Sequence, residues 1–153
     1  MIDLQEIERI KRLKYRYFRT LDQHNWNELA ECFAEDAVTN YDSGKYSFQG
    51  KKNIIDFLKQ YMDRPTLITQ HQAHHPEIDL TGDTTAKGIW YLQDIVIDLD
   101  ANTTLRGAGF YHDEYVKING EWKIKLTGYV RTYEEIEKRS EKIKVIKNMF
   151  DEG

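Results

Sequence analysis

The sequence predicts an α+β fold in which a strongly curved, mostly antiparallel sheet wraps around three N-terminal helices. Two observations carry this prediction. In the first 64 residues, apolar side chains recur every three or four positions, which is the spacing of amphipathic helices. From residue 66 to residue 133 the chain is rich in Thr, Ile, Val, Tyr and Trp and is interrupted by turn signals, as long strands are. The open end of such a sheet is a natural place for a pocket.

The first two helices begin at recognisable caps. A capping box that starts at Asp3 opens the first helix, and its apolar stripe continues to Leu21 and includes Tyr17. A second capping signal at Asn25 opens a shorter helix with an apolar face that extends to Phe33. These two helices are expected to pack as a hairpin.

The third helix follows two short strands. The strands are expected over 37–41 and 45–49, on either side of a Gly-containing turn. After Gly50, apolar residues again recur at helical spacing. The helix ends before Pro65, because proline disfavours a helical conformation in the residue that precedes it.

Three turn signals divide the remaining chain into four long antiparallel strands. They lie at 81–83, 100–102 and 119–120, and the last is an Asn-Gly pair, which strongly favours a tight hairpin. Beyond the strands, 134–153 has a charged, helix-forming composition with a broken apolar stripe, so we expect a tail helix or an extended segment there. With 153 residues, the chain has the length of one domain, and we expect a single domain over 1–153.

Composition argues against several classes of protein. The chain has 22 Lys and Arg against 26 Asp and Glu, a net charge of -4, and no run of basic residues, so we do not expect nucleic acid as a partner. No apolar run approaches the ~20 residues of a membrane span. The single cysteine, Cys32, cannot form an internal disulfide and fits a reducing compartment. The sequence therefore predicts a cytoplasmic protein that binds no membrane.

Alternation along two strands suggests a catalytic pair. Because alternate strand residues share a face, Asp94 is expected to point inward with Trp90, and His74 to point inward with Ile78. The turn at 81–83 places position 74 opposite the low nineties, so His74 and Asp94 could meet inside the cone. A carboxylate that orients an imidazole gives a general base that works near neutral pH. The alternative is a core histidine with satisfied hydrogen bonds and a buried aspartate that caps a backbone amide.

Four more polar residues are candidates for the pocket. Tyr17 places a phenol on the apolar face of the first helix, where it could donate to a ketone or enolate oxygen or simply be a core tyrosine. Asp22 lies at the end of that helix and could instead belong to the turn that follows. The sequence does not determine which way Tyr41 and Arg131 face, because β-bulges shift the alternation.

No metal or cofactor is expected. In a strand, His71 and His74 would face opposite sides, and no acidic third ligand has the usual spacing. The sequence has no Gly-rich phosphate loop, no GxSxG and no CxxC, so it lacks the motifs of nucleotide binding, serine-nucleophile hydrolysis and thiol redox chemistry.

Several segments together resemble a known family. These segments are KYRYFRTLDQHNWNELAECFAEDAV, HQAHHPEI, GIWYLQDIVI, Gly109-Phe110-Tyr111 and TGYVRTYEE. Through them the chain resembles the SnoaL-like branch of the NTF2-like superfamily, and within it the bile-acid 7-alpha-dehydratases that are related to scytalone dehydratase. The resemblance covers nearly the whole chain and implies an NTF2-like α+β cone.

This resemblance implies a cofactor-independent lyase that removes water from a 7-alpha-hydroxy-3-oxo-4-ene steroid, free or as its coenzyme A thioester. It also implies a homo-oligomer, a trimer or a dimer. Two alternatives stay open: an isomerase-like or polyketide-cyclase-like enzyme acting on another enolisable ketone, and a non-catalytic protein that binds a small molecule. The implied catalytic residues are Tyr17, His74 and Asp94, and the implied substrate-binding residues are Asp22, Tyr41 and Arg131.

Overall fold

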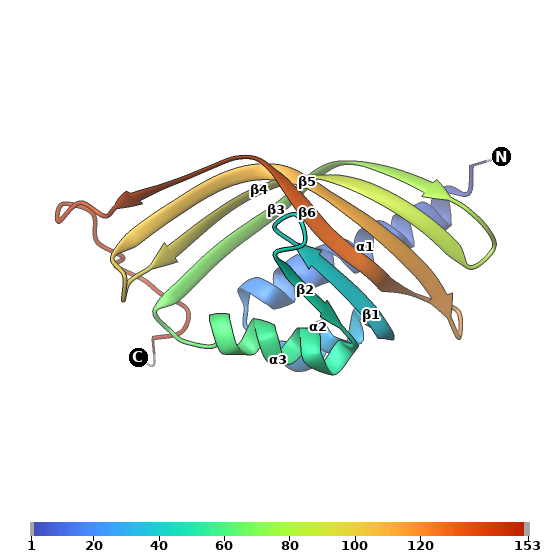
Figure 1. Cartoon of the computed structure of the whole chain (residues 1–153), viewed down its shortest axis with the longest axis horizontal. Coiled ribbons are helices and arrows are strands. Elements are labelled where there is room, and N and C mark those ends of the chain that lie inside the picture. The colour runs from blue at the N-terminus through green and yellow to red at the C-terminus, as the bar shows by residue number, and fades with distance from the viewer. Residues whose placement is uncertain (1, 152–153) are drawn as a thin grey trace.

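The computed structural model describes residues 2–151 and has a six-stranded curved sheet whose concave side holds the three helices (Figure 1). The predicted α+β cone is confirmed. In chain order the elements are α1 (Leu4–Asp22), α2 (Trp26–Glu31), β1 (Phe33–Tyr41), β2 (Tyr46–Gln49), α3 (Lys51–Met62), β3 (Leu67–Leu80), β4 (Thr85–Asp98), β5 (Thr103–Ile118) and β6 (Glu121–Lys138).

The helix starts agree with their predicted caps. The Asp3 side chain accepts hydrogen bonds from the backbone N–H groups of Gln5 and Glu6, at 3.1 and 3.2 Å. The Asn25 side chain caps α2 in the same way. The expectation that Phe33 belongs to the second helix is wrong. That helix ends at Glu31 and Phe33 is already the first residue of β1.

The sheet has the strand order β2-β1-β6-β5-β4-β3, and only the β1–β6 pair is parallel. The four long strands form three successive hairpins, as predicted. At the last of these turns, Asn119 and Gly120 have φ values of 51° and 79°, the left-handed conformation that a tight hairpin turn requires. The long strands arch over α1, so the inner face of the sheet and the helices enclose the core (Figure 1).

The expected tail begins later than position 134, and the described part of it contains no helix. β6 continues to Lys138 because it remains paired with β5, where Leu105 lies opposite Ile136. Backbone pairing thus outweighs the helix-forming composition of this segment. Beyond β6 the chain turns back towards the helices (Figure 1), where the Phe150 ring stacks on His24 with 4.1 Å between ring centroids.

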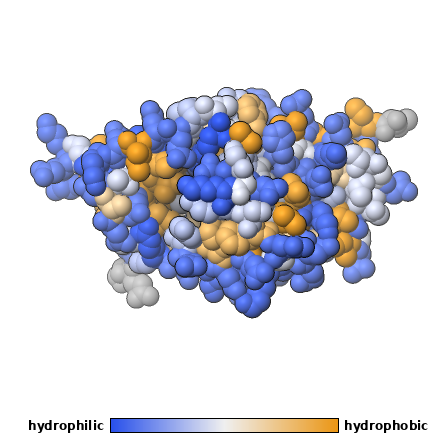
Figure 2. Space-filling model, in the orientation of Figure 1, coloured by the Kyte–Doolittle hydropathy of each residue, from blue (hydrophilic) through white to orange (hydrophobic). Residues whose placement is uncertain are grey.

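Figure 2 shows that hydrophilic side chains cover most of the face it displays, with hydrophobic side chains in separate patches. Within residues 2–151, no helix combines the length and the apolar composition that crossing a membrane requires.

An ion pair joins the loop after α3 to the last residue of β4 and makes stability depend on pH. The Arg64 guanidinium lies 2.8 Å from Asp98 and holds the pKa of that carboxyl at about 2. Because the pKa is lower in the folded state than the ordinary value near 3.9, the pair stabilises the fold above about pH 4 and the stabilisation is lost as pH falls towards 2. We expect Asp98→Asn to lower the urea midpoint at pH 7 and the difference from the wild type to shrink as pH falls through 2.

The control for this prediction is Asp56→Asn. Asp56 also forms an ion pair, with Lys52, but both side chains are largely exposed, so this substitution is expected to change the urea midpoint little at any pH. Equal effects of the two substitutions at pH 7 would contradict the prediction.

Candidate active site

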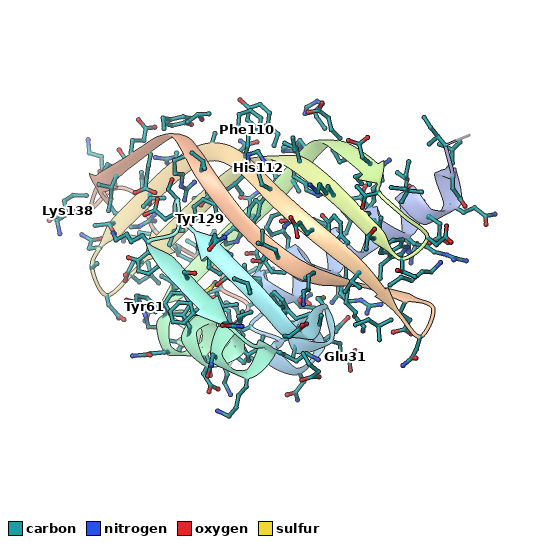
Figure 3. The ribbon with its side chains drawn as sticks, turned by 45° about the vertical axis from the view of Figure 1, so that its right-hand side comes forward. Glu31, Tyr61, Phe110, His112, Tyr129 and Lys138 are labelled. Atoms are coloured by element: carbon teal, nitrogen blue, oxygen red, sulfur yellow. The ribbon has the colours of Figure 1, made fainter. Side chains whose placement is uncertain are left out.

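A pocket of about 410 Å³ lies at the open end of the cone, between the inner face of the sheet and α3. Seven of its lining side chains are those of Tyr or Phe, and most of its charged side chains come from loops or from the end of a strand. Figure 3 places Tyr61 on α3 and Tyr129 on β6, whereas Phe110 and His112 project from the convex side of the sheet, away from the helices. The polar lining residues used below are Tyr17, Tyr41, His71, Tyr111, Tyr129 and Arg131.

The histidine in this pocket is His71. Its Nδ1 lies 2.7 Å from Oδ1 of Asp22, and its backbone N–H donates to Oδ2 of the same carboxylate at 2.8 Å. Because a carboxylate only accepts, Nδ1 carries the proton and the lone pair of the neutral ring is on Nε2. The imidazole also stacks on Phe18, with planes 9° apart. Asp22 and Phe18 therefore hold both the tautomer and the orientation of the ring in the form that general-base chemistry requires.

Thr69 completes the support of this pair. Its hydroxyl donates to Oδ1 of Asp22 at 2.7 Å, so the carboxylate at the end of α1 receives three hydrogen bonds from β3. Asp22 was expected to be a substrate-binding residue. In the structure its carboxylate is the hydrogen-bond partner of His71, and among residues 2–151 the ring of His71 makes no hydrogen bond other than the one between Nδ1 and Asp22.

The expectation that His74 points into the cone and meets Asp94 is wrong. His74 lies opposite Tyr91 in the β3–β4 register, and Tyr91 is 41% exposed on the outer face. The residue opposite Asp94 is His71. The predicted pairing of position 74 with the low nineties was nearly right, but the His74 side chain lies on the outer face of the sheet and not on the inner face.

A β-bulge causes this inversion. Between His74 and Glu77 the register shifts by one, so that two residues, His75 and Pro76, lie opposite Trp90. His75 adopts a left-handed φ of 48°, and Pro76 has no N–H to contribute to the ladder. After the bulge, the residues of β3 that face inward therefore have even numbers, up to Leu80. Before the bulge, the inward-facing residues have odd numbers. A proline inside a predicted strand was the signal that could have located it.

Asp94 faces inward as predicted and is only 3% exposed, but its partner is Arg131. The guanidinium forms two hydrogen bonds with the carboxylate, one of them 2.9 Å long. Burial alone lowers the pKa of Arg131, yet the hydrogen bonds and the charge of Asp94 outweigh burial and raise it above its ordinary value. Arg131 is therefore a permanent cation on the pocket wall, fixed in place by a buried carboxylate.

The structure brings Tyr17 and Tyr41 together. Their hydroxyl oxygens are 2.6 Å apart, both side chains are buried, and both line the pocket. Burial raises the pKa of each phenol above its ordinary value, and it raises the pKa of neighbouring Tyr129 to about 12. These phenols stay protonated at neutral pH, so they are hydrogen-bond donors for an oxygen in the pocket.

A glycine on β5 leaves the space for the Asp94–Arg131 pair. A Cβ on Gly107 would lie 2.5 Å from Nη1 of Arg131 and 3.1 Å from the carbonyl oxygen of Tyr133. Since Asp94 holds the guanidinium, Gly107→Ala is expected to displace Arg131 and to lower the free energy of unfolding by about 1–3 kcal/mol. Urea denaturation measures this change. In an Arg131→Met background the same substitution should cost much less, and equal costs in the two backgrounds would contradict the prediction.

The site offers acid–base chemistry from its own side chains. A carboxylate-oriented imidazole, two protonated phenols and a fixed cation surround one pocket, an arrangement suited to removing a proton from carbon and stabilising the negative charge that results. Among residues 2–151, no three His, Cys, Asp or Glu side chains gather into a group that could hold a metal ion.

Comparisons with known proteins agree with the fold. A proposed scytalone dehydratase from Novosphingobium aromaticivorans has a similar structure, with a TM-score of 0.78, 25% identity, and coverage of 86% of this chain and 87% of that one. A type 2 hexachlorocyclohexane dehydrochlorinase (LinA) has a TM-score of 0.78 at 19% identity, with 87% and 89% covered. The LinA-type3 dehydrochlorinase of Novosphingobium barchaimii has a TM-score of 0.77 at 17% identity, with 87% and 90% covered. Because the two dehydrochlorinases are only 19% and 17% identical to this chain, their similarity shows a shared fold and nothing more.

The family itself follows from the sequence. The SnoaL-like domain family matches residues 3–127, which is more than half of the 153 residues. The curved sheet around N-terminal helices is the NTF2-like cone of that family. The chain therefore belongs to the SnoaL-like family of the NTF2-like superfamily.

Proposed function

We propose that this protein is a lyase that eliminates a small leaving group, water, from an apolar ring substrate by acid–base catalysis. One observation carries the proposal: Nδ1 of His71 lies 2.7 Å from Asp22 on the wall of an aromatic pocket of about 410 Å³. That volume is within the ordinary range of small-molecule sites. The names of the similar structures, a dehydratase and two dehydrochlorinases, support elimination as the reaction type.

The substrate class we propose is a 7-alpha-hydroxy-3-oxo-4-ene steroid, free or as its coenzyme A thioester. The enone acidifies the hydrogen on carbon 6, so Nε2 of His71 takes that proton and the electron pair passes to the ketone oxygen as a dienolate. Collapse of the dienolate breaks the bond between carbon 7 and its hydroxyl. The imidazolium returns the proton to the departing oxygen, which leaves as water, and a conjugated dienone remains.

The other pocket residues receive supporting roles. One hydroxyl of the Tyr17–Tyr41 pair donates to the other, and the hydroxyl whose proton remains available donates to the ketone oxygen. The high pKa values keep both phenols protonated. Arg131 adds positive charge where the dienolate develops, and Asp94 positions Arg131. These assignments replace the catalytic pair of His74 and Asp94, because only His71 combines an oriented ring with a place on the pocket wall.

An ultraviolet assay tests the proposal. Purified protein is mixed with a 7-alpha-hydroxy-3-oxo-4-ene bile acid or with its coenzyme A ester, and the long-wavelength band of the extended dienone is followed. We expect the band with wild type and its loss with His71→Gln. If folded wild-type protein saturated with either compound produces no band, the steroid assignment is refuted. A different enolisable ketone, or binding without turnover, then takes its place.

We also propose that the protein forms a dimer or a trimer through the outer face of the sheet. Tyr91, Phe110 and Val130 lie side by side on three neighbouring strands of that face. Tyr91 and Val130 are exposed, and the rings of Tyr91 and Phe110 are 4.6 Å apart. A row of apolar side chains of this kind supports an interface between copies.

A further inference from the structure

A lysine is completely buried behind the pocket. Lys14, on the inner face of α1, has no exposed surface, and the proposed reaction does not use it. Its Nζ lies 2.8 Å from Oδ2 of Asp113 and 3.3 Å from the hydroxyl of Thr127. Burying a charge is costly unless the charge is paired, so this position requires the complete set of partners that surrounds it.

The carboxylate of this pair is fully engaged on the side away from the pocket. Asp113 accepts hydrogen bonds from the hydroxyls of Thr127 and Tyr115, at 2.6 and 2.7 Å. Tyr115 in turn accepts from the indole N–H of Trp90 at 2.8 Å. Residues Asp113, Tyr115, Thr127 and Trp90 do not line the pocket.

The ammonium group, by contrast, lies against the rings that form the site. Its Nζ is 3.7 Å from the ring centroid of Tyr111 and 4.6 Å from that of Tyr17, and both tyrosines line the pocket. It is also 5.1 Å from the centroid of Phe18, the ring on which His71 stacks. The positive end of the ion pair therefore faces the site through three aromatic rings, and the negative end faces the core.

We propose that the Lys14–Asp113 pair is a positioning element that favours negative charge on an oxygen bound at Tyr17 and Tyr41. This inference rests on the proposed function, because the dienolate is the oxygen anion it would stabilise. A cation against the face of a phenol ring makes the hydroxyl a stronger donor, and a preorganised charge in a dry site needs no rearrangement during the reaction. Burial also lowers the pKa of Lys14, while the charge of Asp113 opposes that change. The charged or titratable groups facing Lys14 are Asp113, Tyr111, Tyr17 and Cys32.

The test uses Lys14→Met combined with Asp113→Asn, which removes both charges and keeps a polar group for Thr127 and Tyr115. The probe is 4-nitrophenol, whose phenol and phenolate forms absorb at different wavelengths. We expect the apparent pKa of the bound probe to rise by about one in the double variant. We also expect the variant to lower kcat about tenfold in the dienone assay with KM less affected.

Lys117→Met is the matched control. Lys117 likewise pairs with a carboxylate, Glu6 at 2.8 Å, and lies 5.7 Å from the ring centroid of Trp122, but none of these residues lines the pocket. This control should leave the pKa of the bound probe unchanged. Lys14→Arg keeps the charge, so the pKa of the probe bound to this variant should be close to the value with wild type. This variant gives a second test if the double variant does not fold.

Two results would overturn the inference: the same probe pKa in wild type and in the variants without the Lys14 charge, or no binding of 4-nitrophenol to wild type. The probe measurement does not depend on turnover. If the dienone assay fails while the probe pKa still shifts, the proposed substrate is wrong and the positioning role of Lys14 stands.

Discussion

His71→Gln is expected to lower kcat/KM for the proposed dehydration by about 10²- to 10⁴-fold, the usual range for loss of a general base. The physical reason is the geometry of the Asp22–His71 pair: the carboxylate holds the proton on Nδ1, and only Nε2 is left to take a proton from substrate. Glutamine retains a side chain of similar reach that can still hydrogen bond with Asp22, so the fold should be kept. Initial rates at saturating and limiting substrate measure the loss.

His74→Gln is the control, because the two histidines lie on the same strand and differ in the face that they occupy. We expect its kcat/KM to stay within about twofold of wild type, since its side chain is opposite the exposed Tyr91. A large loss in His74→Gln together with normal turnover in His71→Gln would refute the assignment and restore the pair that the sequence suggested. Circular dichroism spectra of both variants exclude unfolding as the cause.

Arg131→Met is expected to destabilise the protein by about 3–5 kcal/mol, because it leaves the carboxylate of Asp94 buried without a partner. The same substitution removes the cation from the pocket wall and should lower kcat as well. The free energy of unfolding from urea denaturation and the dienone assay measure the two effects separately.

The control is the double variant Asp94→Leu with Arg131→Met, in which no unpaired charge is left. We expect it to recover much of the lost stability, since replacing a buried ion pair by apolar side chains is often close to neutral. Turnover should stay low in the double variant, because the cation is still missing. If the single and the double variant are both as stable as wild type, Arg131 is not needed to compensate the buried charge of Asp94.

Local signals in the sequence determined most of the elements. The Asp3 and Asn25 caps, the proline after α3 and the Asn119-Gly120 turn each act over a few residues, and the structure has the expected helix start or turn at each of them. Two expectations failed where tertiary contacts override local preference. Phe33 joins β1, which pairs with β6, and the charged segment after position 134 extends β6 along β5.

In the candidate site, the sequence predicted the orientation of one residue correctly and that of another wrongly. Alternation predicted that Asp94 faces inward, because β4 is regular from Ala86 to that residue. The same method selected His74 instead of His71, because one extra residue at the bulge of β3 moves every earlier side chain to the other face. Asp22 and Arg131 were candidates whose orientation the sequence did not determine, and their partners could not be predicted from spacing.

The sequence by itself determined the fold class, the family and the inward orientation of Asp94, since these depend on local periodicity and on motifs. Only the tertiary structure decided that His71 pairs with Asp22, that Arg131 pairs with Asp94, and that Lys14 lies buried against Asp113. These partners are 49, 37 and 99 positions apart in the chain, the last from residue 14 to residue 113. Contacts between residues so far apart in the chain depend on the curvature of the sheet and on one bulge. Neither feature leaves a periodic pattern of residues in the sequence.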